Sequence, residues 1–71
     1  SSAASDVYKR QVTVLSETAM KSDALATALN AMELEQAILY SNKNNINAIF
    51  FSYLDEETEV IFSNSMAEIV K

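Results

Sequence analysis

S-D-A-L-A-T-A-L, residues 22–29, predicts the start of a helix, and the other elements of the chain are placed relative to it. Ser22 is a favourable N-cap, because its hydroxyl can accept a hydrogen bond from a backbone N–H of the first turn. Asp23 then follows at the positive end of the helix dipole. The Ala and Leu residues of the stretch are strong helix formers. We therefore expect a helix that is capped by Ser22.

Asp23 and Thr27 are four residues apart, so a helix brings their side chains onto one face. Two interpretations of this pair are open. In the structural one, Asp23 complements the helix dipole and Thr27 bonds back to a backbone carbonyl. In the functional one, the two stacked oxygens act together in chemistry. Residue types alone favour the structural interpretation, because acidic residues are common in the first turn of a helix.

The hydrophobic pattern predicts a strand before this helix and a second helix after it. Val12–Ser16 alternates and is rich in β-branched residues, which indicates a strand with Val12 and Val14 on one face. The apolar stripe of the first helix loses its phase at Glu33–Glu35, so we expect a break or sharp kink there. The two stripes are Leu25, Ala28, Leu29 and Met32, and then Leu34, Ala37, Ile38 and Ser41.

The second half of the chain predicts a helix stop and a β-hairpin. Four Asn residues between positions 42 and 47 favour closure of the helix, because Asn tolerates the left-handed conformation. Ala48–Leu54 is apolar on both faces, so we expect it to be central or covered on both sides. The remaining segments are expected to be a turn at Asp55–Thr58, a strand at Glu59–Ser63, and a short helix or frayed end at Ala67–Lys71.

These elements give the order β-α-α-β-β and an α+β fold. The acidic residues around the hairpin are interpreted as a solvated turn rather than as a cation site, because nothing makes them converge. They are Asp55, Glu56, Glu57 and Glu59.

V-T-V-L-S-E-T-A-M-K-S-D-A-L-A-T-A-L, residues 12–29, resembles the C-terminal region of the FAD:protein FMN transferases (the ApbE-like flavin transferases). In that family a strand of the type V-T-V-x-A and a short loop lead into A-M-x-A-D-A-L-A-T-A-L. The resemblance covers residues 12–71, and the D-x-x-x-T spacing is its most specific part. The chain departs from the family at Glu33-Leu34-Glu35-Gln36, where a G-P-E-E loop is usual, and at Ser63–Met66, where the family often has S-P-G-F.

The resemblance implies that residues 12–71 are the C-terminal part of a flavin-transferase domain, whose strands join a larger mixed sheet with helices packed on it. It further implies an Mg²⁺ ion at the flavin pyrophosphate, with Asp23 and Thr27 among its ligands. FAD is the substrate, and FMN is transferred onto a Thr or Ser hydroxyl of a target flavoprotein. No catalytic residue is assigned in this segment, and the flavin-binding residues are expected upstream. Family members are often periplasmic or membrane-anchored lipoproteins, and the localisation of this chain is not predicted.

Composition excludes several other classes of site. The chain has 71 residues, a net charge of −5, and no Cys, His, Gly or Pro. Without Cys or His there is no disulfide framework, no thiolate zinc site and no ordinary catalytic triad. No basic patch points to nucleic acid, and no apolar run is long enough to span a membrane. The lack of Gly and Pro fits a piece of a fold better than a complete domain.

Residues 1–11, S-S-A-A-S-D-V-Y-K-R-Q, match nothing in the transferase family and resemble translated sequencing-adapter read-through. We expect them not to be native sequence and exclude them from the functional argument. Residues 7–11 favour β structure and can extend the first strand by default.

A second hypothesis belongs to a different class of protein. The chain would then be a small, non-catalytic α+β interaction module whose sheet edge or helix face pairs with another chain. A third and weaker hypothesis is a small-ligand or metal-sensing domain. A magnesium titration separates the first two, because an interaction module gives no reason for the signals of Asp23 and Thr27 to shift.

Overall fold

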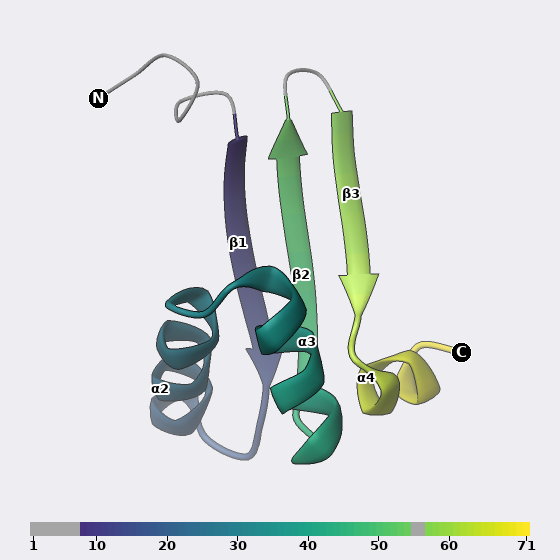
Figure 1. Ribbon diagram of the computed structural model, residues 1–71. Coiled ribbons are helices and arrows are strands. Elements are labelled where there is room, and N and C mark those ends of the chain that lie inside the picture. The colour runs from purple at the N-terminus through teal and green to yellow at the C-terminus, as the bar shows by residue number, and fades with distance from the viewer. Residues whose placement is uncertain (1–7, 55–56) are drawn as a thin grey trace.

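The computed structural model describes residues 8–54 and 57–71, and it confirms the α+β fold. Figure 1 shows three strands in one sheet with helices packed against it. The elements in chain order are β1 (Tyr8–Leu15), α2 (Ala19–Asn30), α3 (Leu34–Lys43), β2 (Asn47–Leu54), β3 (Glu57–Phe62) and α4 (Asn64–Ile69).

The sheet has the strand order β1-β2-β3, and both pairings are antiparallel. Strand β2 is therefore central, as its apolar sequence predicts. Val12 lies opposite Phe50, which in turn lies opposite Ile61 on β3. From the sequence we also expect these strands to join a larger mixed sheet with strands from another part of the protein, and that expectation stays a prediction.

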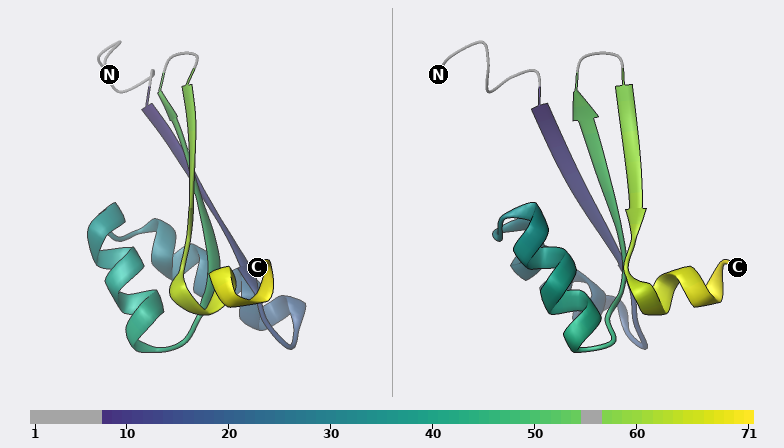
Figure 2. Two further views of the ribbon diagram at one scale, coloured as in Figure 1. Left: turned by 90° about the vertical axis from the view of Figure 1, so that its right-hand side faces the viewer. Right: turned by 45° about the vertical axis from the view of Figure 1, so that its right-hand side comes forward.

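Helices α2 and α3 pack on one face of the sheet (Figure 2), and the hydrophobic core lies between these helices and that face. Val12 and Val14 point into this core, which confirms the face predicted for them. The fully buried members of the core come from α2, α3 and β2, and they are Leu29, Ala37, Ala48 and Phe50. Neither α2 nor α3 covers the opposite face, and α4 lies at the end of the sheet where β3 stops, in contact with β2 and β3 (Figure 2).

The predicted break between the first two helices is confirmed. Helix α2 ends at Asn30 and α3 begins at Leu34, so the change of hydrophobic phase marks a change of element. Leu25, Met32, Leu34 and Ile38 pack against the core, although Ala28 of the first stripe is exposed. None of the described helices is long and apolar enough to cross a membrane.

Three predicted boundaries are corrected. Strand β1 begins at Tyr8 rather than Val12, which is the extension that the β-favouring residues 7–11 allow, since residues 8–11 pair with β2. Strand β3 begins at Glu57, inside the predicted turn, and residues 55 and 56 of that turn lie outside the described residues. Helix α4 begins at Asn64 rather than Ala67, because the Ser63 hydroxyl accepts a hydrogen bond from the N–H of Met66 at 3.4 Å and caps it.

Candidate functional site

The start of α2 differs from the prediction and changes the setting of Asp23. Thr18, not Ser22, is the N-cap, and its Oγ1 accepts a hydrogen bond from the Lys21 N–H at 3.1 Å. Ser22 already donates its backbone N–H to the Thr18 carbonyl, so it lies inside the helix. Asp23 is therefore beyond the first turn, which contains no acidic residue. The predicted contact of Asp23 with the helix N-terminus is wrong.

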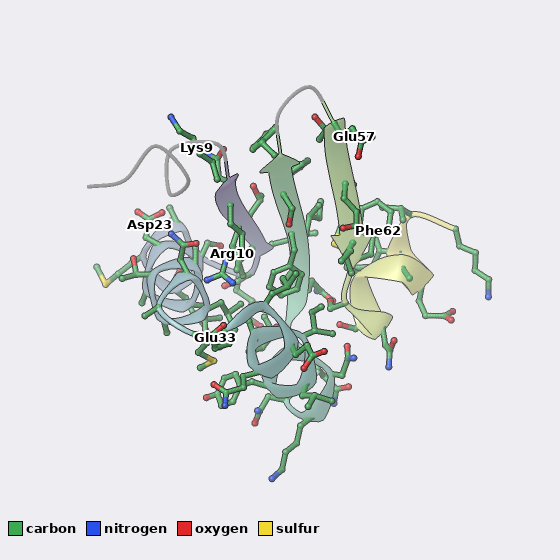
Figure 3. The ribbon with its side chains drawn as sticks, turned by 45° about the horizontal axis from the view of Figure 1, so that its top comes forward. Lys9, Arg10, Asp23, Glu33, Glu57 and Phe62 are labelled. Carbon is green, nitrogen blue, oxygen red and sulfur yellow. The ribbon has the colours of Figure 1, made fainter. Side chains whose placement is uncertain are left out.

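Asp23 and Thr27 share one exposed face of α2. Both residues are exposed, whereas Leu25 packs against the core and Leu29 is fully buried. Residues two apart on a helix point in nearly opposite directions, so the buried leucines direct the oxygen pair away from the sheet. Figure 3 shows Asp23 on the outer side of α2. Because α2 includes both residues, Asp23 and Thr27 lie on one helix face, as their spacing predicts.

The Asp23 and Thr27 side chains make no hydrogen bond or ion pair with another described residue. A carboxylate and a hydroxyl are hard oxygen ligands of the kind that Mg²⁺ prefers, so the residue types fit the metal. Among residues 8–54 and 57–71, no group of three or more Asp, Glu, His or Cys side chains gathers into a metal site. Water, phosphate oxygens or further protein groups would have to supply the other ligands.

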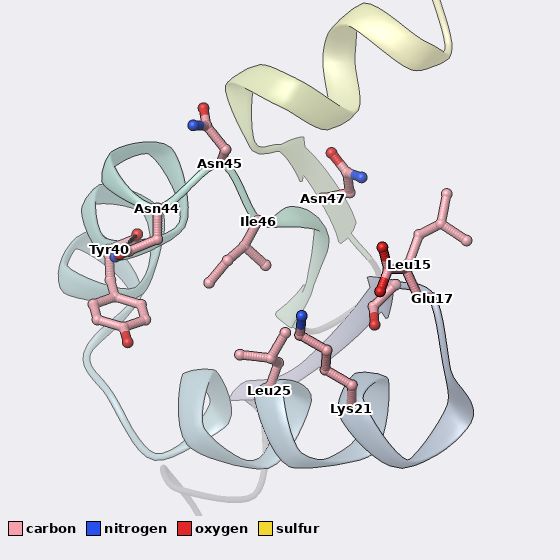
Figure 4. A pocket seen from close by; sticks show the side chains of 10 residues that line it. Leu15, Glu17, Lys21, Leu25, Tyr40, Asn44, Asn45, Ile46 and Asn47 are labelled. Carbon is pink, nitrogen blue, oxygen red and sulfur yellow. Dashed lines mark hydrogen bonds between the residues drawn. The ribbon is translucent and has the colours of Figure 1, made fainter.

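A cavity of about 330 Å³ lies on another side of the molecule, where β1 runs into α2 and α3 runs into β2. Figure 4 shows Lys21 extending from α2 toward Ile46, with Tyr40 contributed by α3. The Ser16 hydroxyl oxygen is buried at this cavity and has no described hydrogen-bond partner. A cavity of this volume suits a small molecule, yet Asp23 and Thr27 do not line it.

The asparagine run forms one wall of this cavity by closing α3, as its composition predicts. Asn45 has a φ of 56°, the left-handed conformation that ends many helices. The Ile46 N–H then bonds to the Ser41 carbonyl at 2.8 Å, and the Asn44 side-chain amide bonds to the Tyr40 carbonyl at 2.9 Å. No local sequence pattern predicts this cavity, because its lining residues come from separate segments of the chain.

A second hollow, between the end of α2 and β1, is crossed by a side chain from the strand. The Arg10 guanidinium donates to the Asn30 carbonyl at 2.9 Å and to the Met32 carbonyl. A cation at the carboxyl end of a helix is a stabilising arrangement. We interpret this hollow as a helix-capping site, and the acids Glu57 and Glu59 on β3 as exposed strand residues.

Comparison of the chain with family models, curated proteins and solved structures found no match. The family membership and the metal-binding roles of Asp23 and Thr27 therefore stay predictions from the quoted residues.

Proposed function

We propose that residues 12–71 are the C-terminal part of an FAD:protein FMN transferase, and that Asp23 and Thr27 are ligands of its Mg²⁺ ion. The observation that carries this proposal is the exposed oxygen pair on α2. Its side chains lie one helical turn apart and are not engaged by other described residues. The order of strand, loop and helix around the pair also agrees with the family pattern.

In the proposed reaction, the hydroxyl oxygen of a Thr or Ser on a target flavoprotein bonds to the FMN phosphorus of FAD. The anhydride P–O bond breaks, and AMP leaves. When bound, the metal neutralises charge on the pyrophosphate. Asp23 contributes the anionic ligand and Thr27 the neutral one. No base for the hydroxyl proton is assigned within residues 8–54 and 57–71, so the chain alone is expected to be inactive.

A paramagnetic metal tests the ligand assignment on the chain itself. We expect Mn²⁺, added with FAD, to broaden the NMR signals of α2 residues around Asp23 and Thr27, since Mn²⁺ accepts the same oxygen ligands. Asp23→Asn should remove this broadening. Glu35→Gln, which neutralises an exposed carboxylate in the first turn of α3, is the matched control and should retain it. Equal broadening in wild type and Asp23→Asn would contradict the proposal.

The activity is tested in a transferase whose upstream part has been joined to this chain. Asp23→Ala is expected to abolish metal-dependent transfer of FMN, because the pyrophosphate charge is then not neutralised at that position. Transfer at the wild-type rate by this variant would contradict the assignment.

The second candidate function is a protein-interaction module, and one observation favours it. The sheet face that lies opposite α2 and α3 exposes apolar side chains to solvent, among them Val60 and Phe62. Exposed apolar patches on small proteins often mark contact surfaces. If Mn²⁺ does not broaden the α2 signals of the wild type, and the chain associates through this face, the interaction module becomes the preferred function.

A further inference from the structure

On the face of the sheet opposite α2 and α3 (Figure 2), strands β2 and β3 form an apolar surface, whereas the β1 side chains on this face include Lys9, Gln11 and Thr13. Because side chains alternate along a strand, the burial of Phe50 turns Ile49 and Phe51 to this other face. The register places Ile49 beside Phe62, and Phe51 beside Val60. Tyr53 continues the row. We call these five residues, Ile49, Phe51, Tyr53, Val60 and Phe62, the open face.

The side chains of the open face are substantially exposed. The exposed fractions are 38% for Tyr53, 48% for Val60 and 40% for Phe62, and Ile49 and Phe51 are half-buried between them. Figure 3 shows Phe62 on β3, on the far side of the sheet from α2. Cross-strand aromatic and β-branched pairs form a continuous apolar surface of this kind.

Charge distinguishes the open face from the rest of the chain. The protein has a net charge of −5, yet no described Asp or Glu lies on this side of the three strands. The register puts Glu59 opposite Ser52 and Glu57 opposite Leu54, which is the side that faces the helices. Two copies can therefore bring their open faces together without opposing carboxylates, whereas contacts through the acidic surfaces are repulsive.

We propose that the open face is a dimerisation surface whose partner is a second copy of this chain. The two sheets pack face to face about a two-fold axis, in the manner of a β-sandwich with sheets about 10 Å apart. This inference rests on the open face and is independent of the flavin-transferase proposal.

The size of the surface sets the strength of the dimer. The two strands that carry the open face, each about six residues long, cover roughly 200 Å². Two such faces bury less than the 1,200 Å² or so that is usual for stable complexes. The dimer is therefore weak, with a Kd on the order of 100 µM, and its population depends on concentration.

Sedimentation velocity of the 71-residue protein, from about 20 µM to about 1 mM, tests the inference around that expected Kd. The wild type should shift from monomer to dimer and stop there. Val60→Lys and Phe62→Lys should each raise the Kd more than about tenfold. In either variant each copy carries one new lysine, so the dimer contact contains two cations. Leu39→Lys is the matched control. Leu39 is 68% exposed on α3, on the other side of the sheet, so the Kd should stay within about twofold.

Circular dichroism shows whether each variant is folded. Val60→Thr keeps the β-branched shape and should weaken the dimer even if a lysine in β3 disturbs the strand. A folded wild type that stays monomeric across the range would overturn the inference. Retained dimers in Val60→Thr and Phe62→Lys, or equal weakening by Leu39→Lys, would do the same. Growth beyond the dimer would indicate pairing of strand edges instead, which is also an overturning result.

Discussion

The Ser63 hydroxyl connects three separate backbone segments at the start of α4. It donates to the Ile46 carbonyl at 2.6 Å and accepts from the Ala48 N–H at 3.0 Å, while also capping α4. Ser63→Ala leaves the buried Ala48 N–H without its described partner and removes the cap of α4, while the Ile46 carbonyl keeps the hydrogen bond from the Ser65 hydroxyl at 3.1 Å. We expect the free energy of unfolding to fall by about 1–3 kcal/mol. Urea denaturation measures this loss.

Ser41 provides the control for that experiment. It is as completely buried as Ser63, but its hydroxyl has no hydrogen-bond partner among the described residues. Ser41→Ala therefore removes an unsatisfied group from a helix and should leave stability unchanged or raise it by about 0.5 kcal/mol. Equal losses in the two variants would show that volume, and not hydrogen bonding, explains the effect at position 63.

Asn45 tests the helix stop at the level of one dihedral angle. A positive φ, as at this position, has a higher conformational energy for Ala than for Gly, and the energy for Asn lies between the two. We expect Asn45→Ala to lower the free energy of unfolding by about 1 kcal/mol and Asn45→Gly to leave it nearly unchanged. The comparison is made by thermal and urea unfolding. A more stable Ala variant than Gly variant would contradict the left-handed conformation.

At the scale of elements, the two possible starts of α2 give opposite predictions. Thr18→Ala removes the observed cap and should cost about 1 kcal/mol of stability. Ser22→Ala replaces a residue inside the helix by a stronger helix former and should be neutral or stabilising by about 0.5 kcal/mol. Denaturant unfolding of both variants decides between them. The reverse order of effects would restore the helix start at Ser22.

The sequence predicted the order of the main elements and the hairpin of the last two strands, because those depend on periodicity and turn residues. The phase slip at Glu33–Glu35 separated α2 from α3, and the two-sided apolar pattern of residues 48–54 identified the central strand. Boundaries were less accurate. Residues 19–21 also favour helix, so the better-placed cap at Thr18 lengthened α2, and strand pairing to β2 extended β1 to Tyr8. The local pattern does not contain these tertiary effects.

The candidate site was predictable in part for the same reason. Spacing alone placed Asp23 and Thr27 on one helix face, and the structure directs that face to solvent. The cavity beside Lys21 and Tyr40 was not predictable, because it forms only when two loops meet at one end of the sheet. Alternation along β3 separates Glu57 and Glu59 from Val60 and Phe62, but the sequence did not show which of these two faces the helices cover, since this depends on strand register.

At the scale of the whole molecule, the core lies within residues 12–71. The described core residues all lie at or after position 12: Val12, Val14, Leu29, Ala37, Ile46, Ala48 and Phe50. Residues 8–11 contribute strand pairing to β2 and the hydrogen bonds from Arg10 to the end of α2. The exclusion of residues 1–11 from the native sequence stays a prediction, and the distribution of the core bears on a separate question, whether residues 8–11 are needed for the fold.

A chain that starts at Val12 should therefore still fold. Its free energy of unfolding should be lower by about 1–3 kcal/mol, because the Arg10 bonds and part of the edge pairing are lost. Arg10→Ala in the full chain separates these two contributions, since it removes only the bonds to Asn30 and Met32. Amide NMR spectra report the fold, and urea unfolding reports the stability. If the shortened chain is unfolded while Arg10→Ala loses about 1 kcal/mol or less, pairing by residues 8–11 is an essential part of this sheet and not an extension of it.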